Sequence, residues 1–307
     1  MLKALQSERA FENRVARVLR ETFDQLYDGV RTGRFRWEQL NKTEKTHAGT
    51  VLQLNLRREF DGFIGDGVEQ DFLIDNVDVD CKFSKDFGKW MIPPEAVGHV
   101  CLLIWGSEQD SAHRTVWSCG LIQIEESGLR PSKNRDAKRN LTLEAISSIK
   151  WLARDAAYPE NLLASLDAVT AEKIFPSGDS PYARGKGSER VRSLFRNVQR
   201  RLIPRTAIET AARQKDPLKR VRGNGGARSV LAQEGIIILG HWDEHCRIAW
   251  ALRLPEPTQS GEFVSAQVER TSDHQQSVEI DGGRWRLARP GAAVSPAPDV
   301  PMKNDDD

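Results

Sequence analysis

The chain has 307 residues with 45 Lys and Arg against 44 Asp and Glu, and 39% of its residues are hydrophobic. This length suggests two domains, and the hydrophobic content supports folded cores and excludes a fully disordered chain. The longest apolar runs, residues 100–105 and 236–239, fall far short of the ~20 residues that span a membrane. The first residues carry charges and show no secretory signal, and the four cysteines are scattered without a CxxC pair, which disfavours a zinc ribbon or a disulfide framework. We therefore expect a cytoplasmic protein with reduced thiols and no membrane association.

The spacing of apolar residues predicts helices and strands along the chain. Apolar residues at steps of three and four favour helices, whereas short runs rich in β-branched residues favour strands. Helices are predicted at residues 5–27, 47–60, 141–154, 161–174, 189–202 and 205–214. Strands are predicted at residues 68–74, 77–83, 100–105, 115–124 and 235–239. The pattern favours an α/β N-terminal part, followed after linkers at residues 154–160 and 176–188 by a part rich in basic helices.

The near-neutral net charge hides a strongly basic segment. Between Arg184 and Arg228 there are fourteen Lys or Arg residues and three acids, an excess of +11. Bases that outnumber acids in this way favour a surface that binds a polyanion, whereas an ordinary solvated helix face usually interleaves the two signs. The segment therefore predicts contact with a nucleic acid.

Residues 69–83 predict a β-hairpin. Asp75 and Asn76 tolerate left-handed backbone angles and can form its two-residue turn. Because side chains alternate between the two faces of a strand, this turn gives one apolar and one charged face. The apolar face holds Phe72, Ile74, Val77, Val79, Cys81 and Phe83, and the charged face holds Asp71, Asp78, Asp80 and Lys82. A slip by one residue would bury the carboxylates, so the pattern fixes the register.

The charged face of this hairpin can carry chemistry. Asp71 and Asp80 are expected opposite each other, and like charges in that position are destabilising unless something compensates. A divalent cation such as Mg²⁺ is the natural partner for carboxylates from two backbone segments. Lys82 lies on the same face, where an ammonium can orient a metal-bound water or stabilise negative charge on a phosphate. The pattern alone leaves open an ordinary edge hairpin with a solvated charged face.

The spacing Asp71-x8-Asp80-x-Lys82 matches the catalytic signature of PD-(D/E)XK nucleases, and the surrounding segments resemble the NaeI family of type II restriction endonucleases. In the first half the matching segments are DQLYDG at 24–29, RTGR at 31–34, KTEKTH at 42–47, VDCKFS at 79–84 and PPE at 93–95. In the second half they are KRVRG at 219–223, GGARS at 225–229 and EGIIILGH at 234–241. The segments follow the family order along nearly the whole chain.

The resemblance implies an α/β fold with a PD-(D/E)XK nuclease domain, a mixed sheet flanked by helices, at residues 1–157. It implies a winged helix-turn-helix-like domain of the catabolite-activator kind at residues 158–292, and we expect a disordered tail at 293–307. The implied activity is Mg²⁺-dependent hydrolysis of double-stranded DNA by a homodimer at a palindromic GC-rich site, with GCCGGC as the sequence that the family suggests. The resemblance also implies that one copy of the site is cut while a second copy is bound as effector.

The resemblance also implies roles for single residues. The family's two metal-binding aspartates fall on Asp71 and Asp80, and its catalytic lysine falls on Lys82. A further acidic residue of the family falls on Gln53, whose neutral carbonyl oxygen would be a weaker metal ligand. Eight basic residues are candidates for DNA contact: Lys42, Lys45, Arg196, Arg200, Lys219, Arg220, Arg222 and Arg228.

Two other readings of the sequence remain open. Gln53, in place of an acidic residue, suggests as an alternative a DNA-binding regulator or a nicking nuclease with a weakened catalytic site. The intact Asp71, Asp80 and Lys82 argue against a regulator. A mismatch-repair nicking nuclease would share the fold. His241 and His245 stand four residues apart in HWDEH, which suggests a zinc site, but the segment lacks the HExxH order and a metal there is disfavoured.

Overall fold

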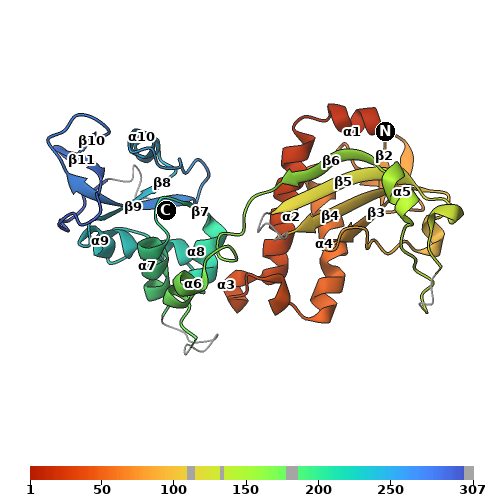
Figure 1. The fold of residues 1–307 in the computed structure, drawn as a ribbon, viewed down its shortest axis with the longest axis horizontal. Coiled ribbons are helices and arrows are strands. Elements are labelled where there is room, and N and C mark those ends of the chain that lie inside the picture. Colours follow the sequence, from red (N-terminus) through yellow and green to blue (C-terminus); the bar gives the residue numbers. More distant parts are fainter. Residues whose placement is uncertain (109–114, 132–134, 178–185, 301–307) are drawn as a thin grey trace. The chain divides into compact units, whose positions relative to one another are not determined.

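The computed structural model describes residues 1–108, 115–131, 135–177 and 186–300, and its chain forms two compact units. The N-terminal unit consists of Met1–Leu26 and Arg36–Asn161. The C-terminal unit consists of Tyr27–Phe35 and Leu162–Asp307. Figure 1 follows the chain through both units.

A six-stranded mixed sheet organises the N-terminal unit, in the order β1-β2-β3-β4-β5-β6. Its strands are β1 (Gly65–Asp66), β2 (Phe72–Ile74), β3 (Val77–Ser84), β4 (Val100–Ser107), β5 (Val116–Gln123) and β6 (Lys150–Ala157). The β3–β4 pair is parallel and the other neighbours are antiparallel. The family resemblance leads us to expect a mixed sheet flanked by helices, and the structure confirms this arrangement.

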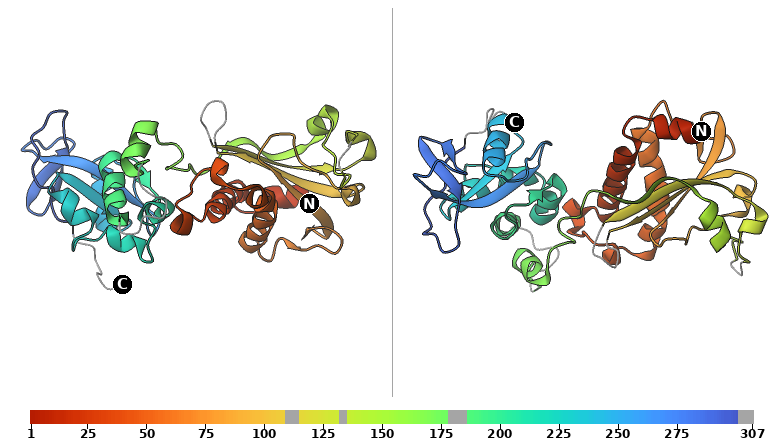
Figure 2. Two further views of the ribbon diagram at one scale, coloured as in Figure 1. Left: turned by 90° about the horizontal axis from the view of Figure 1, so that it is seen from below. Right: turned by 45° about the horizontal axis from the view of Figure 1, so that its top comes forward.

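Four α-helices accompany this sheet: α1 (Leu2–Ser7), α2 (Phe11–Tyr27), α4 (Lys42–Glu59) and α5 (Leu143–Ser148). The helices α2 and α4 cover the same face of the sheet (Figure 2). The apolar stripe of α2 includes Val15, Leu19 and Phe23, each at most 1% exposed. Helix α4 begins at a capping box, in which the Asn41 side chain accepts from the Glu44 N–H and the Glu44 carboxylate accepts from the Asn41 N–H. This pair satisfies backbone donors that a helix start leaves open and fixes where α4 begins.

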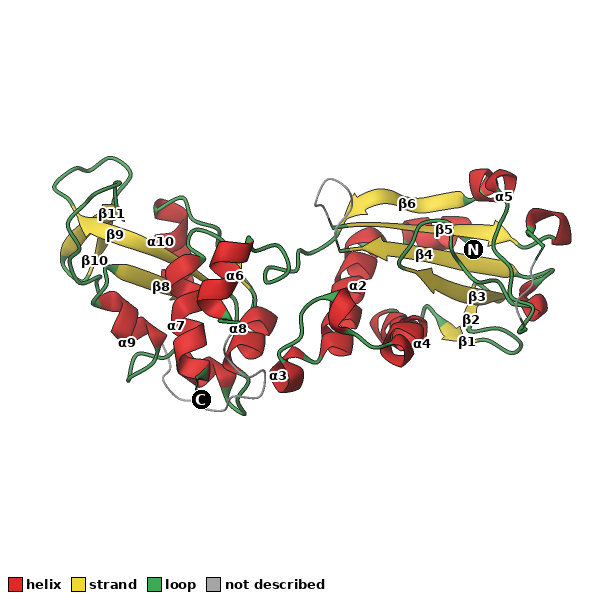
Figure 3. Cartoon of the chain, turned by 60° about the horizontal axis from the view of Figure 1, so that its bottom comes forward, coloured by secondary structure: helices red, strands yellow, loops and turns green. Residues whose placement is uncertain are grey.

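The C-terminal unit contains a second, antiparallel sheet (Figure 3). Its path is β10-β11-β9-β7, and β8 also pairs with β9. The strands are β7 (Leu202–Ile203), β8 (Ile236–Gly240), β9 (Phe263–Arg270), β10 (Val278–Ile280) and β11 (Gly283–Leu287). The helices are α3 (Gly29–Thr32), α6 (Ala168–Ile174), α7 (Gly187–Asn197), α8 (Arg205–Ala212), α9 (Ala227–Ala232) and α10 (Asp243–Ala251). Single-turn 3-10 helices are η1 (Trp37–Gln39), η2 (Pro94–Ala96) and η3 (Glu126–Gly128) in the N-terminal unit and η4 (Pro217–Arg220) in this one.

The segment Tyr27–Phe35 packs within the C-terminal unit although it lies between α2 and α4 in the sequence. The ring of Phe35 contacts that of Phe175 in a tilted arrangement, with ring centroids 5.3 Å apart, and it packs against the apolar core of that unit. Gly29 sits so close to α8 that a Cβ atom there would lie 2.1 Å from the Thr210 Oγ1. The sequence suggested a single domain boundary near residue 158 and did not indicate that the segment Tyr27–Phe35 belongs to the C-terminal unit.

The secondary structure differs from the sequence prediction in several places, among them the helix predicted at residues 189–202, which ends at Asn197 and is followed by strand β7 at Leu202–Ile203. The helix predicted at residues 141–154 is wrong after Ser148, because strand β6 follows from Lys150 and pairs with β5. The helix predicted at residues 161–174 is confined to Ala168–Ile174. The strands β9, β10 and β11 and the helix α10 were not predicted, although α10 buries Ile248 and Ala249.

The tail expected to be disordered at residues 293–307 lies partly outside the described residues. Its part up to Val300 has no regular secondary structure, but it is packed. The Ala297 N–H donates to the Ala232 carbonyl at 2.8 Å, and Val300 is 2% exposed in an apolar cluster of the C-terminal unit. In the ranges that the structure describes, no helix is long and apolar enough to cross a membrane.

Candidate active site

The hairpin that carries the candidate catalytic residues has the predicted register. Phe72 pairs with Val79 and Ile74 pairs with Val77. The turn residues Asp75 and Asn76 both have positive φ, at 53° and 60°, as a type I′ hairpin turn requires. The predicted apolar face is buried at Phe72 and Val79 but not at its end, where Val77 is 37% exposed because the turn leaves the core.

Asp71 lies just before the first residue of β2, next to the part of β3 that β2 no longer covers. Its Oδ2 accepts hydrogen bonds from the Cys81 N–H at 2.9 Å and from the Gln53 Nε2 at 2.8 Å. The Lys82 Nζ lies 3.7 Å from the same oxygen. The side chain of Asp71 is thus joined to β3 by its carboxylate.

Asp80 and Lys82 form a tight, largely buried pair. Asp80 is 4% exposed, its Oδ1 accepts from the Lys82 Nζ, and its Oδ2 accepts from the Cys101 Sγ at 3.4 Å. Burial raises the pKa of Asp80, against the opposing effect of Lys82. Burial alone would lower the pKa of Lys82, but its hydrogen bond to Asp80 and the negative charges of Asp80 and Asp71 raise it overall. Lys82 is therefore an ammonium group at neutral pH.

Gln53 reaches this place from α4. Its Nε2 donates to the Asp71 Oδ2 at 2.8 Å and to the Cys81 carbonyl at 2.9 Å. Both partners are acceptors only, so they require the amide nitrogen and not the amide oxygen to face them. The family resemblance suggested a weak metal ligand here, and the structure shows an amide donor between two oxygen atoms. Glu59, the acidic residue further along α4, is bound to Arg14 and lies away from this cluster.

The oxygen atoms gathered here have the chemistry of a magnesium site. Among the described residues, no group of three His, Cys, Asp or Glu side chains is arranged to hold a metal ion. Two carboxylates, from Asp71 and Asp80, meet around the Lys82 Nζ, and that ammonium also lies 3.4 Å from the Cys81 carbonyl. Hard oxygen donors of this kind suit Mg²⁺, which keeps several waters and completes its shell with substrate phosphate oxygens. The donor set therefore fits Mg²⁺.

The basic candidates for DNA contact lie in different environments. In the N-terminal unit, Lys42 and Lys45 occupy the first turn of α4, where Lys42 is exposed. In the C-terminal unit, Lys219 and Arg220 lie on η4, and the exposed Arg222 follows in the turn before α9.

The Lys219 Nζ pairs with the Asp216 Oδ2 at 3.1 Å, and three further basic candidates in the C-terminal unit also contact groups within the chain. Arg196 on α7 makes a two-pronged ion pair with Glu234, with both contacts at 2.7 Å. Arg228 on α9 donates to the Val300 carbonyl. Arg200, after α7, is exposed and lies 3.4 Å from the Ala288 carbonyl. Arg196 and Arg228 thus have a structural contact in addition to their charge.

Sequence reasoning missed two residues of this cluster. Arg57, one turn after Gln53 on α4, donates to the Asp71 backbone carbonyl at 2.9 Å. The buried Cys101 thiol, whose pKa is raised by burial and which therefore stays protonated, donates to Asp80. The four-residue step from Gln53 to Arg57 was visible in the sequence, whereas the approach of Cys101 depends on the parallel β3–β4 register.

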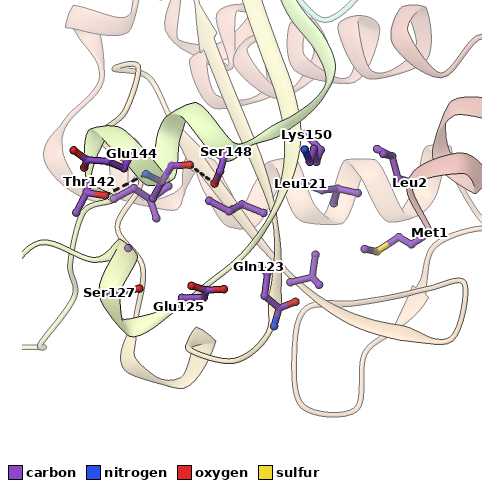
Figure 4. Close-up of a pocket in the computed structure, with 15 residues that line it drawn as sticks. Met1, Leu2, Leu121, Gln123, Glu125, Ser127, Thr142, Glu144, Ser148 and Lys150 are labelled. Atoms are coloured by element: carbon purple, nitrogen blue, oxygen red, sulfur yellow. Dashed lines mark hydrogen bonds between the residues drawn. The ribbon is translucent and has the colours of Figure 1, made fainter.

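A cavity of about 750 Å³ lies elsewhere in the N-terminal unit (Figure 4). Leu121 and Gln123 of β5 line it together with Thr142 and Ser148 around α5 and the N-terminal Met1. Within the described part of the chain, its lining does not include the Asp71–Asp80–Lys82 cluster. At the HWDEH segment, His245 is fully buried and its Nδ1 accepts from the Gly240 N–H at 2.9 Å, which gives the ring a structural role.

Comparison with known proteins identifies the family. Residues 2–296 match the family described as restriction endonuclease NaeI. The chain is 48% identical over 295 residues to the type II restriction enzyme NaeI of Lentzea aerocolonigenes, and the match covers 95% of this chain and 90% of that protein. The chain therefore belongs to the NaeI family and is a type II restriction endonuclease.

Proposed function

We propose that the protein is a Mg²⁺-dependent, site-specific deoxyribonuclease whose active site is formed by Asp71, Asp80 and Lys82. The observation that supports this proposal is the meeting of two carboxylates, from Asp80 of β3 and from Asp71 just before β2, around one ammonium group. This arrangement corresponds to the PD-(D/E)XK nuclease fold, which we propose for the N-terminal unit.

The reaction adds water across a phosphodiester P–O bond, and it leaves one phosphate monoester and one hydroxyl group. When bound, Mg²⁺ would lower the pKa of a water and offset charge on the phosphate. Asp71 and Asp80 would hold the ion with their carboxylates. The Lys82 ammonium would orient the attacking water and stabilise the negative charge that develops on the phosphate oxygens. As an ammonium, Lys82 serves as an electrostatic group and does not accept the proton of the water.

For the C-terminal unit we propose a winged helix-turn-helix-like domain that binds duplex DNA. Helices α7, α8 and α9 belong to one apolar core, and η4 with the following turn carries Lys219, Arg220 and Arg222. Basic side chains on such a surface neutralise phosphates. With the excursion Tyr27–Phe35 added, this unit is the candidate for the second, effector DNA site.

The recognised sequence and the assembly are proposals of the same kind. A palindromic target matches the two-fold symmetry of a homodimer, and GCCGGC is the sequence that family membership suggests. Arginine and lysine are the residues that read guanine through its O6 and N7 atoms in the major groove, which agrees with a basic surface and a GC-rich site.

The test is cleavage of a supercoiled plasmid by the purified protein. We expect linear product with Mg²⁺, no product with EDTA, and no product from Asp80→Ala, which should still bind DNA. Asp61→Ala, which removes an exposed carboxylate just after α4, is the matched control and should cut normally. Cleavage by Asp80→Ala, or cleavage in excess chelator, would refute the proposed site.

The same assay examines the alternative that Gln53 motivates. A nicking nuclease would accumulate open circles without linear product. A regulator would bind the plasmid and leave it supercoiled under all metal conditions. Linear DNA as the end product excludes both.

A further inference from the structure

The backbone pairing of β2 with β3 does not include Asp71, although the Cys81 N–H of β3 donates to its carboxylate at 2.9 Å. The β2–β3 pairing ends at Phe72 and Val79, and Asp71 lies one residue outside β2. Strand β2 has only three residues and its outer neighbour β1 has two. A carboxylate at the end of so short a strand needs other contacts to keep one orientation.

Helix α4 supplies such contacts from two side chains one turn apart. Gln53 holds the carboxylate of Asp71, through the Oδ2, and the Cys81 carbonyl. Arg57 holds the backbone of the same residue, because its Nη2 donates to the Asp71 carbonyl at 2.9 Å. The Arg57 Nη1 also pairs with Asp66 of β1 at 2.5 Å.

The helix that carries these two residues is well fixed. Its capping box sets its start, and Leu52 and Leu56, the residues directly before Gln53 and Arg57, are at most 1% exposed. Residues four positions apart lie on the same face of a helix, so the two polar groups face the hairpin together. Arg57 lacks an acceptor atom and cannot ligate a metal.

We propose that Gln53 and Arg57 are positioning residues that fix Asp71 for metal binding, with Gln53 acting as a hydrogen-bond donor. Gln53 orients the carboxylate so that its other oxygen, Oδ1, is presented to the ion. Arg57 fixes the main chain that carries this carboxylate. The inference depends on the proposed function, because it assigns a role toward the metal that Asp71 and Asp80 would hold.

The experiment compares full-length variants with wild type for two quantities. The first is the Mg²⁺ concentration for half-maximal plasmid cleavage. The second is Mn²⁺ affinity measured by calorimetry without DNA, well below each variant's melting temperature. The variants are Gln53→Met, Arg57→Met and Arg57→Lys, and the matched control is Arg58→Met, which removes an exposed arginine from the same helix.

Loss of one such hydrogen bond is expected to weaken metal binding roughly tenfold. Gln53→Met and Arg57→Met should each raise the Mg²⁺ midpoint by about that factor and lower the Mn²⁺ affinity in parallel. Arg57→Lys keeps a charged donor and should fall between wild type and Arg57→Met; it also serves as the test variant if Arg57→Met does not fold. Arg58→Met should match wild type.

Three outcomes would overturn the inference. The first is that Gln53→Met and Arg57→Met both keep the metal dependence of wild type, which would show that α4 does not position Asp71. If Arg57→Met does not fold, Arg57→Lys takes its place in this comparison. An equal shift in Arg58→Met would point to general loss of charge. A lower maximal rate with unchanged metal affinity would place the two residues outside the metal function. Failure of the proposed function itself looks different, because Asp71→Ala would then still cut DNA.

Discussion

The exchange Gln53→Glu is the most informative single perturbation of this site. It replaces the amide nitrogen with a carboxylate oxygen at a position that faces the Asp71 Oδ2 at 2.8 Å and the Cys81 carbonyl at 2.9 Å. An ionised glutamate cannot donate to either atom. At neutral pH and without metal, the variant must therefore keep two carboxylates side by side or protonate one of them.

The size of the effect follows from these two options. Two unit charges about 4 Å apart repel by roughly 4 kcal/mol at an effective dielectric constant near 20. Protonating a glutamic acid of ordinary pKa, about 4.3, at pH 7 costs about 3.7 kcal/mol, which sets a similar ceiling. Because Lys82 offsets part of the repulsion, we expect the free energy of unfolding of Gln53→Glu to fall by about 2–4 kcal/mol. For a domain of this size, this corresponds to a fall in melting temperature of roughly 5–15 °C.

The loss of stability in Gln53→Glu should be larger at pH 7 than at pH 5. In the folded variant the pKa of the new carboxyl is raised above its unfolded value, so the penalty is absent below the unfolded pKa and grows as the pH rises. At pH 5 the protonation cost is only about 1 kcal/mol. Gln53→Met loses the same hydrogen bonds without adding charge, so its melting temperature should differ from wild type by a constant amount over this range.

The assay is thermal unfolding of wild type, Gln53→Glu and Gln53→Met at pH 5 and pH 7, with and without Mg²⁺. Mg²⁺ should raise the melting temperature of Gln53→Glu by more than that of wild type, because a bound cation removes the repulsion and stabilises the folded state. An unchanged melting temperature at pH 7 without metal would refute this reasoning. A fall of the same size at both pH values would refute it as well.

Three further predictions follow. Lys82→Met should lower the cleavage rate at saturating Mg²⁺ by about 10²–10³, measured by plasmid cleavage, because it removes the ammonium that we propose stabilises charge on the phosphate; a rate within a few-fold of wild type would contradict that role. Arg222→Ala should reduce the slope of log affinity for duplex DNA against log salt concentration by about 1. Arg196→Ala should instead mainly lower the melting temperature, because it removes the ion pair with Glu234. A fragment of residues 158–307 should gain melting temperature when a peptide of residues 27–35 is added, since that segment packs against the core of the C-terminal unit.

The hairpin could be predicted from sequence because its information is local. Alternation with a period of two fixes the faces, and Asp75 and Asn76 supply the turn, so the register follows by counting. The same counting placed Asp80 and Lys82 on one face. It did not show that Asp80 is buried at 4% exposure, because that depends on the parallel strand β4, in which Cys101 pairs with Asp80 from twenty-one residues further along the chain.

The contacts of Asp71 show where local reasoning ends. Gln53 was identified from a family position, which suggests a metal ligand and not an amide that donates to Asp71. The role of Arg57 needs the packing of α4 against β3, and periodicity alone does not give the partner of a helix. Strand β6 was mistaken for helix because its apolar residues alternate weakly, and only Ala153 is buried within it; its pairing with β5 decides its conformation.

The excursion Tyr27–Phe35 gives the chain a connectivity that a division by length does not anticipate. The helices α2 and α4 are joined through a segment that is part of the C-terminal unit, and α4 carries Gln53 and Arg57, which contact Asp71. Six residues, 36–41, separate this segment from the start of α4 at Lys42, and the capping box at Asn41 fixes where the helix begins. A change in the C-terminal unit that displaced Phe35 would therefore act on the chain shortly before the helix whose Gln53 and Arg57 contact Asp71. For an enzyme proposed to bind a second DNA copy as effector, covalent continuity gives a physical route from that copy to the proposed metal site, and it requires no change in the sheet that holds Asp80 and Lys82.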